Sequence, residues 1–345
     1  MLSSSLPSSS ISLGRGGQPR VLVSHAATNA HLEVYLHGGQ ITSYRFDDAE
    51  LLYLSEAAIF DGKTAIRGGI PICFPQFGSQ GPLPAHGFAR TSLWSLISVS
   101  DGFVELELRD SESTRTLWGP YTFSARLEIK FAGPTLNVTF SVRNLGERGG
   151  GGGGAESSSS IITTTGTAET AAVQSTSPPF RVQALLHAYL NLGKEGAVTI
   201  DGKDSHVTVQ VLGGKRYLDT PPSRRELVVA SENAPLSLIG EFDRVFIAPT
   251  ENTVLVHGAN NNVIRVTRNA TVSRQLTGQQ GIPVPSDVVV WNPGKLRNAA
   301  IKDLDVNAWT RFVCVEPGIV TPETILELAG GESMSLNVIY EMMAA

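Results

Sequence analysis

Cysteine and long apolar runs are scarce in this sequence. Only Cys73 and Cys314 occur among 345 residues, too few for a disulfide framework, and we expect a reducing compartment. No run of about 18 apolar residues is present, so neither a membrane-spanning segment nor a membrane partner is predicted. The net charge of −5 argues against a nucleic-acid partner, because binding nucleic acid needs a basic surface. Apolar residues still make up 41% of the chain, enough for a sizeable core.

Acidic residues are absent from the first 18 positions, which are rich in serine and carry Arg15. A secretory signal would need an apolar core of roughly 7 to 15 residues, and this segment has none. Its composition predicts a disordered tail over residues 1–18, with a short transit peptide as the alternative. We expect residues 19–345 to form one domain of a cytoplasmic protein, or of a plastid protein if the tail is a transit peptide.

Apolar and polar residues alternate with period two through most of the chain. The clearest runs are residues 32–36, 104–108, 123–131, 136–142, 207–211 and 334–340. Such runs, separated by Gly, Pro, Asn and Asp clusters, predict half-buried antiparallel strands. The best short helix candidate is Asn298 to Asp305. We therefore expect an all-β sandwich of many strands.

Residues 146–177 break the pattern with six consecutive glycines and a Ser/Thr/Ala-rich tract. This composition cannot bury enough surface to offset its ordering entropy, so a flexible loop is predicted. A linker between two domains is the alternative. Because the strands predicted on either side have the same character, we favour an insertion within a single domain, where a long loop adds little closure entropy.

Negative charge is also missing from residues 62–100, which contain no Asp or Glu but hold Arg67, His86 and Arg90. A window of this length would hold about 3.6 acidic residues at the average density of the chain. Arginines in a Gly- and Pro-rich loop of an acidic protein indicate an anion pocket, since guanidinium groups fit phosphate oxygens. The alternative, in which Arg67 and Arg90 pair with carboxylates elsewhere, has equal weight on composition alone.

A two-faced strand is predicted around His187. Between residues 181 and 192 every even-numbered position is apolar, and the odd-numbered positions carry Arg181, Gln183, Leu185, His187, Tyr189 and Asn191. Such a strand could form the floor of a polar ligand site. The alternative is a solvent-facing strand, the more common place for a lone histidine.

Two acidic residues interrupt apolar runs and are candidates for catalysis. Glu316 lies just before a Pro-Gly turn, where partial burial would raise its pKa and make it a base near neutral pH. Its alternative role is to cap nearby backbone N–H groups. Asp243 enters the apolar run 241–247 and is a weak signal alone. The sequence shows no metal-ligand spacing, phosphate-binding loop or Gly-x-Ser-x-Gly elbow, so no metal or cofactor is expected.

Six segments, in order along the chain, resemble the aldose 1-epimerase (galactose mutarotase-like) superfamily and, within it, the glucose-6-phosphate 1-epimerase branch. They are Arg67–Gly78 (RGGIPICFPQFG), Leu83–Arg90 (LPAHGFAR), Leu186–Tyr189 (LHAY), Phe242–Val245 (FDRV), Val290–Pro293 (VWNP) and Val313–Gly318 (VCVEPG). The resemblance implies a large antiparallel β-supersandwich, a monomer, a sugar phosphate as the only partner, and no cofactor. It also implies that His187 protonates the ring oxygen while Glu316 takes the proton of the O1 hydroxyl.

The same resemblance implies the residues that bind the substrate. Arg67 and Arg90 match substrate-binding positions, Asp243 matches a position that binds sugar hydroxyls, and His86 is expected to line the cleft. Ala85 stands where the superfamily commonly has Gln, and Gly294 where it often has an aromatic residue, which affects substrate preference more than chemistry.

Three rival functions remain open at this point. The first is a catalytically silent sugar-phosphate binder, since fold does not imply function. The second is a glycoside hydrolase that uses Asp243 and Glu316 as its carboxylate pair. The third is an epimerase for neutral aldoses, in which Arg67 and Arg90 would be dispensable.

Overall fold

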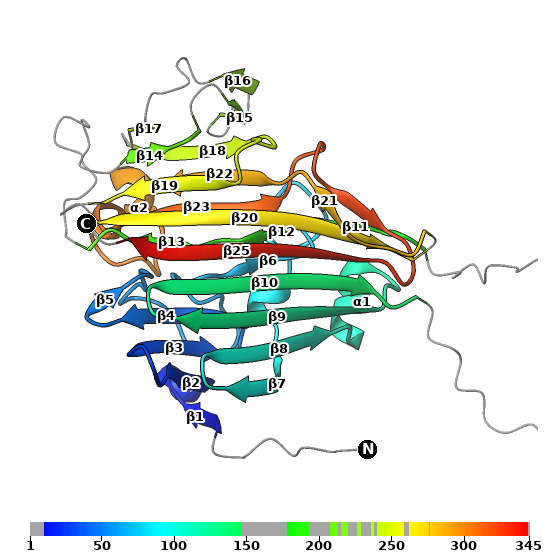
Figure 1. Cartoon of the computed structure of the whole chain (residues 1–345), viewed down its shortest axis with the longest axis horizontal. Coiled ribbons are helices and arrows are strands. Elements are labelled where there is room, and N and C mark those ends of the chain that lie inside the picture. Colours follow the sequence, from blue (N-terminus) through cyan, green and yellow to red (C-terminus); the bar gives the residue numbers. More distant parts are fainter. Residues whose placement is uncertain are drawn as a thin grey trace, which may run out of the picture.

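The computed structural model describes residues 10–146, 178–193, 208–212, 215–219, 226–228, 236–237, 240–258, 262–275 and 277–343. The predicted all-β architecture is confirmed: antiparallel strands form two large sheets, a five-stranded sheet and a strand pair (Figure 1). The Gly/Ser-rich segment 146–177 lies outside the described residues apart from its first residue. No helix in the described ranges is long and apolar enough to cross a membrane.

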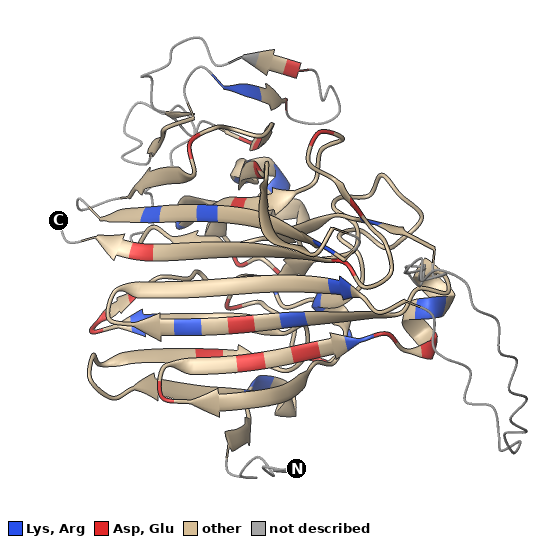
Figure 2. Ribbon diagram, turned by 45° about the vertical axis from the view of Figure 1, so that its right-hand side comes forward, with Lys and Arg blue, Asp and Glu red and all other residues tan. Residues whose placement is uncertain are grey.

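A ten-stranded sheet forms one layer of the sandwich. Its order is β17-β14-β19-β20-β25-β10-β9-β8-β7, with β21 also pairing with β20. The bounds are β7 Ser95–Ser100, β8 Phe103–Arg109, β9 Phe123–Ala132, β10 Thr135–Asn144, β14 Thr208–Gln210, β17 Leu236–Ser237, β19 Thr253–His257, β20 Val263–Arg274, β21 Gln279–Val284 and β25 Ser333–Met343. Charged residues of both signs lie along β8 and β9 (Figure 2) and pair between the strands, as Arg126 does with Glu105 at 2.9 Å.

An eight-stranded sheet forms the layer that carries the site. Its order is β16-β15-β18-β22-β23-β12-β6, and β13 also pairs with β23. The bounds are β6 Ile72–Cys73, β12 Ala184–Leu186, β13 Tyr189–Asn191, β15 Arg216–Leu218, β16 Glu226–Val228, β18 Phe242–Phe246, β22 Asp287–Asn292 and β23 Phe312–Ile319.

The smaller elements flank these layers. The five-stranded sheet contains β1 Ile11–Leu13, β2 Pro19–His25, β3 Ala30–Tyr35, β4 Gln40–Phe46 and β5 Ala49–Glu50, and the strand pair contains β11 Phe180–Val182 and β24 Leu326–Leu328. The helices in the described residues are α1 Glu112–Trp118 and α2 Gly294–Ala300, with 3₁₀ turns at Arg15–Gly17, Ala89–Thr91 and Ala308–Thr310.

Two local predictions need correction. The tail predicted over residues 1–18 includes ordered structure from residue 10 onward, because β1 pairs with β2 and the Arg15 backbone N–H donates to Tyr35 Oη at 2.9 Å; residues 1–9 lie outside the described residues. The helix predicted over Asn298 to Asp305 instead spans Gly294–Ala300, directly after Pro293, and proline favours the first turn of a helix.

The predicted alternation around His187 places the strand between two apolar clusters. The main core lies between the two large sheets and includes the even-numbered residues from Val182 to Leu192 together with Leu336, Val338 and Tyr340 of β25. Leu185 and Tyr189 instead join a second cluster on the opposite face of the eight-stranded sheet, with Trp291, Phe312 and Cys314. Because side chains alternate along a strand, this second face can present polar groups without disturbing the main core.

Candidate active site

Strand register brings His187 and Glu316 together. His187 connects β12 to β13, and both strands pair with β23 in one register, Leu185 with Gly318 and Tyr189 with Cys314. That register places His187 opposite Glu316. The His187 backbone N–H donates to the carbonyl of Pro71 at 2.9 Å on the other side, so the residue is held on both flanks although it belongs to no strand.

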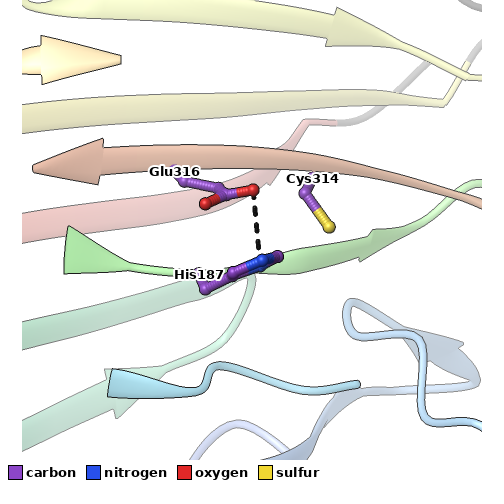
Figure 3. Close-up of side chains that lie close together, drawn as sticks. All are labelled: His187, Cys314 and Glu316. Atoms are coloured by element: carbon purple, nitrogen blue, oxygen red, sulfur yellow. Dashed lines mark ion pairs between the residues drawn. The ribbon is translucent and has the colours of Figure 1, made fainter. Parts of the chain in front are cut away.

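The two side chains meet on the face of the sheet that carries the second cluster. His187 Nδ1 lies 3.4 Å from Glu316 Oε1 (Figure 3), and their side chains are only 10% and 1% exposed. The His187 ring stacks on Tyr189 with centroids 4.9 Å apart and planes at 11°. Trp291 contacts both rings edge-on. Aromatic packing therefore fixes the imidazole plane while Glu316 faces one of its nitrogens.

His86 lies beside this pair. Its ring centroid is 5.8 Å from that of His187, and its Nδ1 is 3.2 Å from Cys73 Sγ. Burial, supported by the charges of Arg90 and Arg67, lowers the pKa of His86 to about 3. Burial is also the main cause that lowers the pKa of His187 well below its usual value, followed by the charges of His86, Arg90 and Arg67. Both imidazoles are therefore neutral at physiological pH.

A cavity of about 590 Å³ opens over the pair. Four of the predicted site residues line it: His86, His187, Asp243 and Glu316. Asp243 reaches the cavity because β18 pairs with β22, which places it opposite Trp291. Phe77, Gln183, Trp291, Arg297 and Thr321 also line this space. The cavity thus combines two carboxylates, two imidazoles and a guanidinium around an apolar floor, the composition of a site for a small polar ligand.

The two predicted anion-binding arginines do not line this cavity. Arg67 donates to Tyr189 Oη at 3.2 Å, and its Nη2 lies 3.2 Å from Asp303 Oδ1. Arg90 donates to the carbonyl of Ala85 at 2.7 Å, and the Ala85 side chain is exposed. Both arginines are nevertheless close enough to lower the pKa of His86 and of His187, so they make the potential in the cavity more positive.

The sequence of this chain is similar to those of proteins named as sugar epimerases. The aldose 1-epimerase family model matches residues 20–148. A protein of Cenchrus ciliaris, provisionally named glucose-6-phosphate 1-epimerase, is 29% identical over 90% of this chain and 81% of its own length. A protein of the same provisional name from Escherichia coli K12 is 28% identical over 86% of this chain and 80% of its own. These matches confirm the resemblance to the aldose 1-epimerase superfamily that the sequence predicted.

The enzyme is accordingly an isomerase of the aldose 1-epimerase type, as the resemblance in its sequence predicted. Among solved structures, YeaD of Salmonella typhimurium, provisionally described as a mutarotase, matches with a TM-score of 0.66 and 24% identity. The match covers 94% of this chain and 91% of that one. At this identity the likeness concerns the fold alone, and it agrees with the predicted galactose mutarotase-like sandwich.

Sequence reasoning missed several residues around the cavity of the enzyme. Gln183 was visible on the polar face of residues 181–192, but its role was not: it donates to the carbonyl of Val320 at 2.8 Å and accepts from the Phe77 N–H at 3.0 Å. It therefore joins two cavity walls. Arg297 lies on α2 and forms an ion pair with Glu241 at 2.5 Å. No sequence pattern marked it, because only the fold brings α2 to the cavity.

Asp287 organises another wall. This carboxylate is fully buried and accepts hydrogen bonds from the backbone N–H groups of Ala248, Val320 and Thr321 at 2.9–3.0 Å. The hydroxyls of Thr321 and Thr324 also donate to it, at 3.1 and 2.5 Å. Five donors compensate the burial of one charge. Four of them, from Val320, Thr321 and Thr324, hold this part of the cavity lining beside the strand that carries Glu316. The fifth, from Ala248, attaches the loop after β18 to the same carboxylate.

Proposed function

We propose that the enzyme interconverts the α and β anomers of a hexose 6-phosphate, with D-glucose 6-phosphate as its main substrate, through His187 and Glu316. The observation that carries the proposal is the 3.4 Å contact between these two side chains where they line the cavity. The chain would act as a single domain, since residues from Val21 to Tyr340 contribute to one continuous main core.

The reaction requires two proton transfers at neighbouring atoms. The ring oxygen and the O1 hydroxyl are bonded to the same carbon, so two groups in contact with one another can each reach one of them. In the proposed roles His187 donates a proton to the ring oxygen while Glu316 takes the proton from O1. The bond between C1 and the ring oxygen breaks, and its electron pair passes to that oxygen as O1 becomes a carbonyl oxygen. Rotation about C1–C2 and closure, with the roles reversed, give the other anomer.

Two observations support a phosphorylated substrate. The curated relatives from Cenchrus ciliaris and Escherichia coli carry the name of a glucose-6-phosphate enzyme. Arg297 lines the cavity, and Arg67 and Arg90 add positive potential near His86 and His187, which favours an anion. Asp243 would accept hydrogen bonds from sugar hydroxyls.

One observation favours the neutral-aldose alternative. The Arg67 and Arg90 side chains already have protein partners in Tyr189, Asp303 and the carbonyl of Ala85. If these arginines only support the fold, glucose would be turned over as well as glucose 6-phosphate, and Arg90→Ala would leave the KM for both sugars unchanged. The phosphate proposal predicts a clear preference for the phosphorylated sugar and a rise in its KM in Arg90→Ala.

NMR exchange spectroscopy of the two anomers of glucose 6-phosphate tests the acid/base pair. Glu316→Gln keeps the size of the side chain but removes the base, so we expect the rate to fall by about 10²–10⁴-fold. Asp243→Asn should raise KM more than it lowers kcat, because its proposed contacts are with hydroxyls. An unchanged rate in Glu316→Gln would defeat the mechanism, and cleavage of aryl glycosides by the wild type would favour a hydrolase.

A further inference from the structure

A third side chain with metal-binding capacity lies beside the acid/base pair. Cys314 and Glu316 are two residues apart on β23 and project from the same face of the strand, towards His187 (Figure 3). One ligand atom from each residue, the Cys314 Sγ, a Glu316 carboxylate oxygen and a His187 ring nitrogen, lies within 4.8 Å of the other two. All three residues are buried. No feature of epimerisation requires a thiol at this position.

The donor set suits a thiophilic divalent cation. Thiolate, imidazole and carboxylate are the ligands that Zn²⁺ prefers in proteins, with bonds of about 2.0–2.3 Å in a tetrahedral shell. Two ligand atoms of such a shell lie about 3.3–3.5 Å apart, and His187 Nδ1 and Glu316 Oε1 are already separated by 3.4 Å. The Cys314 sulfur already lies within 4.8 Å of a ligand atom of each of the other two residues.

A cation also has a route to this position. His187 and Glu316 both line the cavity, so an ion can enter along the path that a sugar would take. Three protein ligands leave the fourth tetrahedral position for water. A thiolate and a carboxylate together balance the charge of a divalent cation, which offsets the positive potential from Arg67 and Arg90.

We propose that His187, Cys314 and Glu316 form an inhibitory binding site for Zn²⁺ or Cd²⁺. On binding, the metal–sulfur bond forms as the thiol proton leaves to solvent, and no electron is transferred. The metal then occupies the His187 nitrogen and the Glu316 oxygen that the acid/base mechanism uses, so the bound enzyme cannot move protons at the anomeric carbon. The inhibition, though not the binding, rests on the proposed function.

Cadmium titration tests the binding without reference to activity. In the wild type, a cadmium–thiolate absorption band should grow to one equivalent, and cadmium NMR should report one sulfur ligand. Cys314→Ala should abolish the band and weaken binding by at least tenfold. Cys73→Ala is the matched control, because Cys73 is equally buried but lies outside the three-residue cluster, and it should leave the band intact.

Epimerase assays with and without ZnCl₂ test the inhibition. Wild type and Cys73→Ala should lose activity as the metal fills its site, and Cys314→Ala should retain activity at the same metal concentration. Absence of a thiolate band in the wild type, or its persistence in Cys314→Ala, would overturn the site. If Cys314→Ala fails to fold, cadmium NMR of the wild type tests the site instead. A bound-cadmium signal that shows no sulfur ligand would reject the site. An enzyme with no epimerase activity that still shows the band would refute the proposed function and leave the site standing.

Discussion

At the scale of single residues, burial sets the protonation state of the imidazoles. The pocket that holds His187 against Glu316 and Tyr189 also lowers the pKa of His187 and His86, because a buried imidazolium loses its hydration. Burial therefore favours the neutral form of both rings, in which one nitrogen carries an N–H donor and the other is a hydrogen-bond acceptor. His86 adopts a left-handed backbone conformation with φ of 66°, so its placement has a conformational cost that the site compensates.

The lowered pKa of His86 predicts a pH dependence of stability. Its folded pKa of about 3 lies below the ordinary 6.5, so below pH 6.5 the unfolded chain binds a proton that the folded chain does not. The free energy of unfolding should therefore fall as pH drops from about 6.5 towards 3. His86→Asn, which tolerates positive φ, should make the loss between pH 7 and pH 5 smaller. Urea denaturation at pH 7 and pH 5 measures this loss of unfolding free energy. His31→Asn, at an exposed histidine, is the control. Equal losses of unfolding free energy in the wild type and in His86→Asn would contradict the prediction.

At the scale of elements, strand pairing positions the candidate acid/base pair while a buried carboxylate shapes one wall of the cavity. The turn after β23 has no regular secondary structure to hold it, and four hydrogen bonds from Val320, Thr321 and Thr324 to Asp287 take that role. Asp287 is therefore a positioning residue for the cavity. The start of α2 depends instead on a glycine. Gly294 has φ of 60°, and a Cβ there would lie 2.6 Å from the backbone of Gly240 and Glu241, so only glycine lets these two segments pack so closely.

Replacement of Asp287 should change substrate binding more than chemistry. Asp287→Asn keeps the shape but loses the charge and places an NH₂ group against donors, which should lower the free energy of unfolding by about 2–3 kcal/mol. Because residues 320–325 would shift while His187 and Glu316 stay in register, we expect KM for glucose 6-phosphate to rise several-fold with a smaller change in kcat.

The matched control for this wall is Asp101→Asn. Asp101 is exposed and accepts one backbone hydrogen bond, from Ala26 at 2.8 Å, so stability and kinetics should change little. Steady-state kinetics and urea denaturation compare the two variants. If kcat fell as much as KM rose in Asp287→Asn, its action would extend to the acid/base pair and the assigned role would be wrong.

At the scale of the whole molecule, residues 10–18 join the fold through the five-stranded sheet. β1 pairs with β2, and the Arg15 guanidinium lies 4.4 Å from the Phe60 ring centre and donates to the carbonyls of Glu56 and Ala58. A variant that begins at Pro19 should therefore unfold about 1–3 kcal/mol more easily than one that begins at Ser10. Thermal and urea denaturation of the two variants measure the difference. Identical stabilities would show that these contacts contribute nothing in solution.

Much of this architecture could be predicted from local patterns, and the rest depended on pairings between distant segments. Alternation along residues 181–192 was enough to assign the even-numbered residues to the core, as observed, but it left open whether the odd-numbered face belonged to a ligand site or faced solvent. No local pattern states that His187 lies opposite Glu316, because their register is set by strands some 130 positions apart. For the same reason the sequence did not predict that Arg297 lines the cavity, because only the packing of α2 brings this residue there. The acid-free loop predicted positive potential near the site, but not that Arg67 would contact Tyr189.

The position of His187 opposite Glu316 has a consequence for how such an enzyme can diversify. Two residues fixed by sheet register keep their spacing as long as the sheet exists, whereas the walls of the cavity come from the Phe77–Gln80 loop, residues 320–325 and α2. Insertions and substitutions in those walls can alter which sugar enters without disturbing the proton donor and acceptor. Selection can therefore act on substrate choice largely through residues other than the proton donor and acceptor.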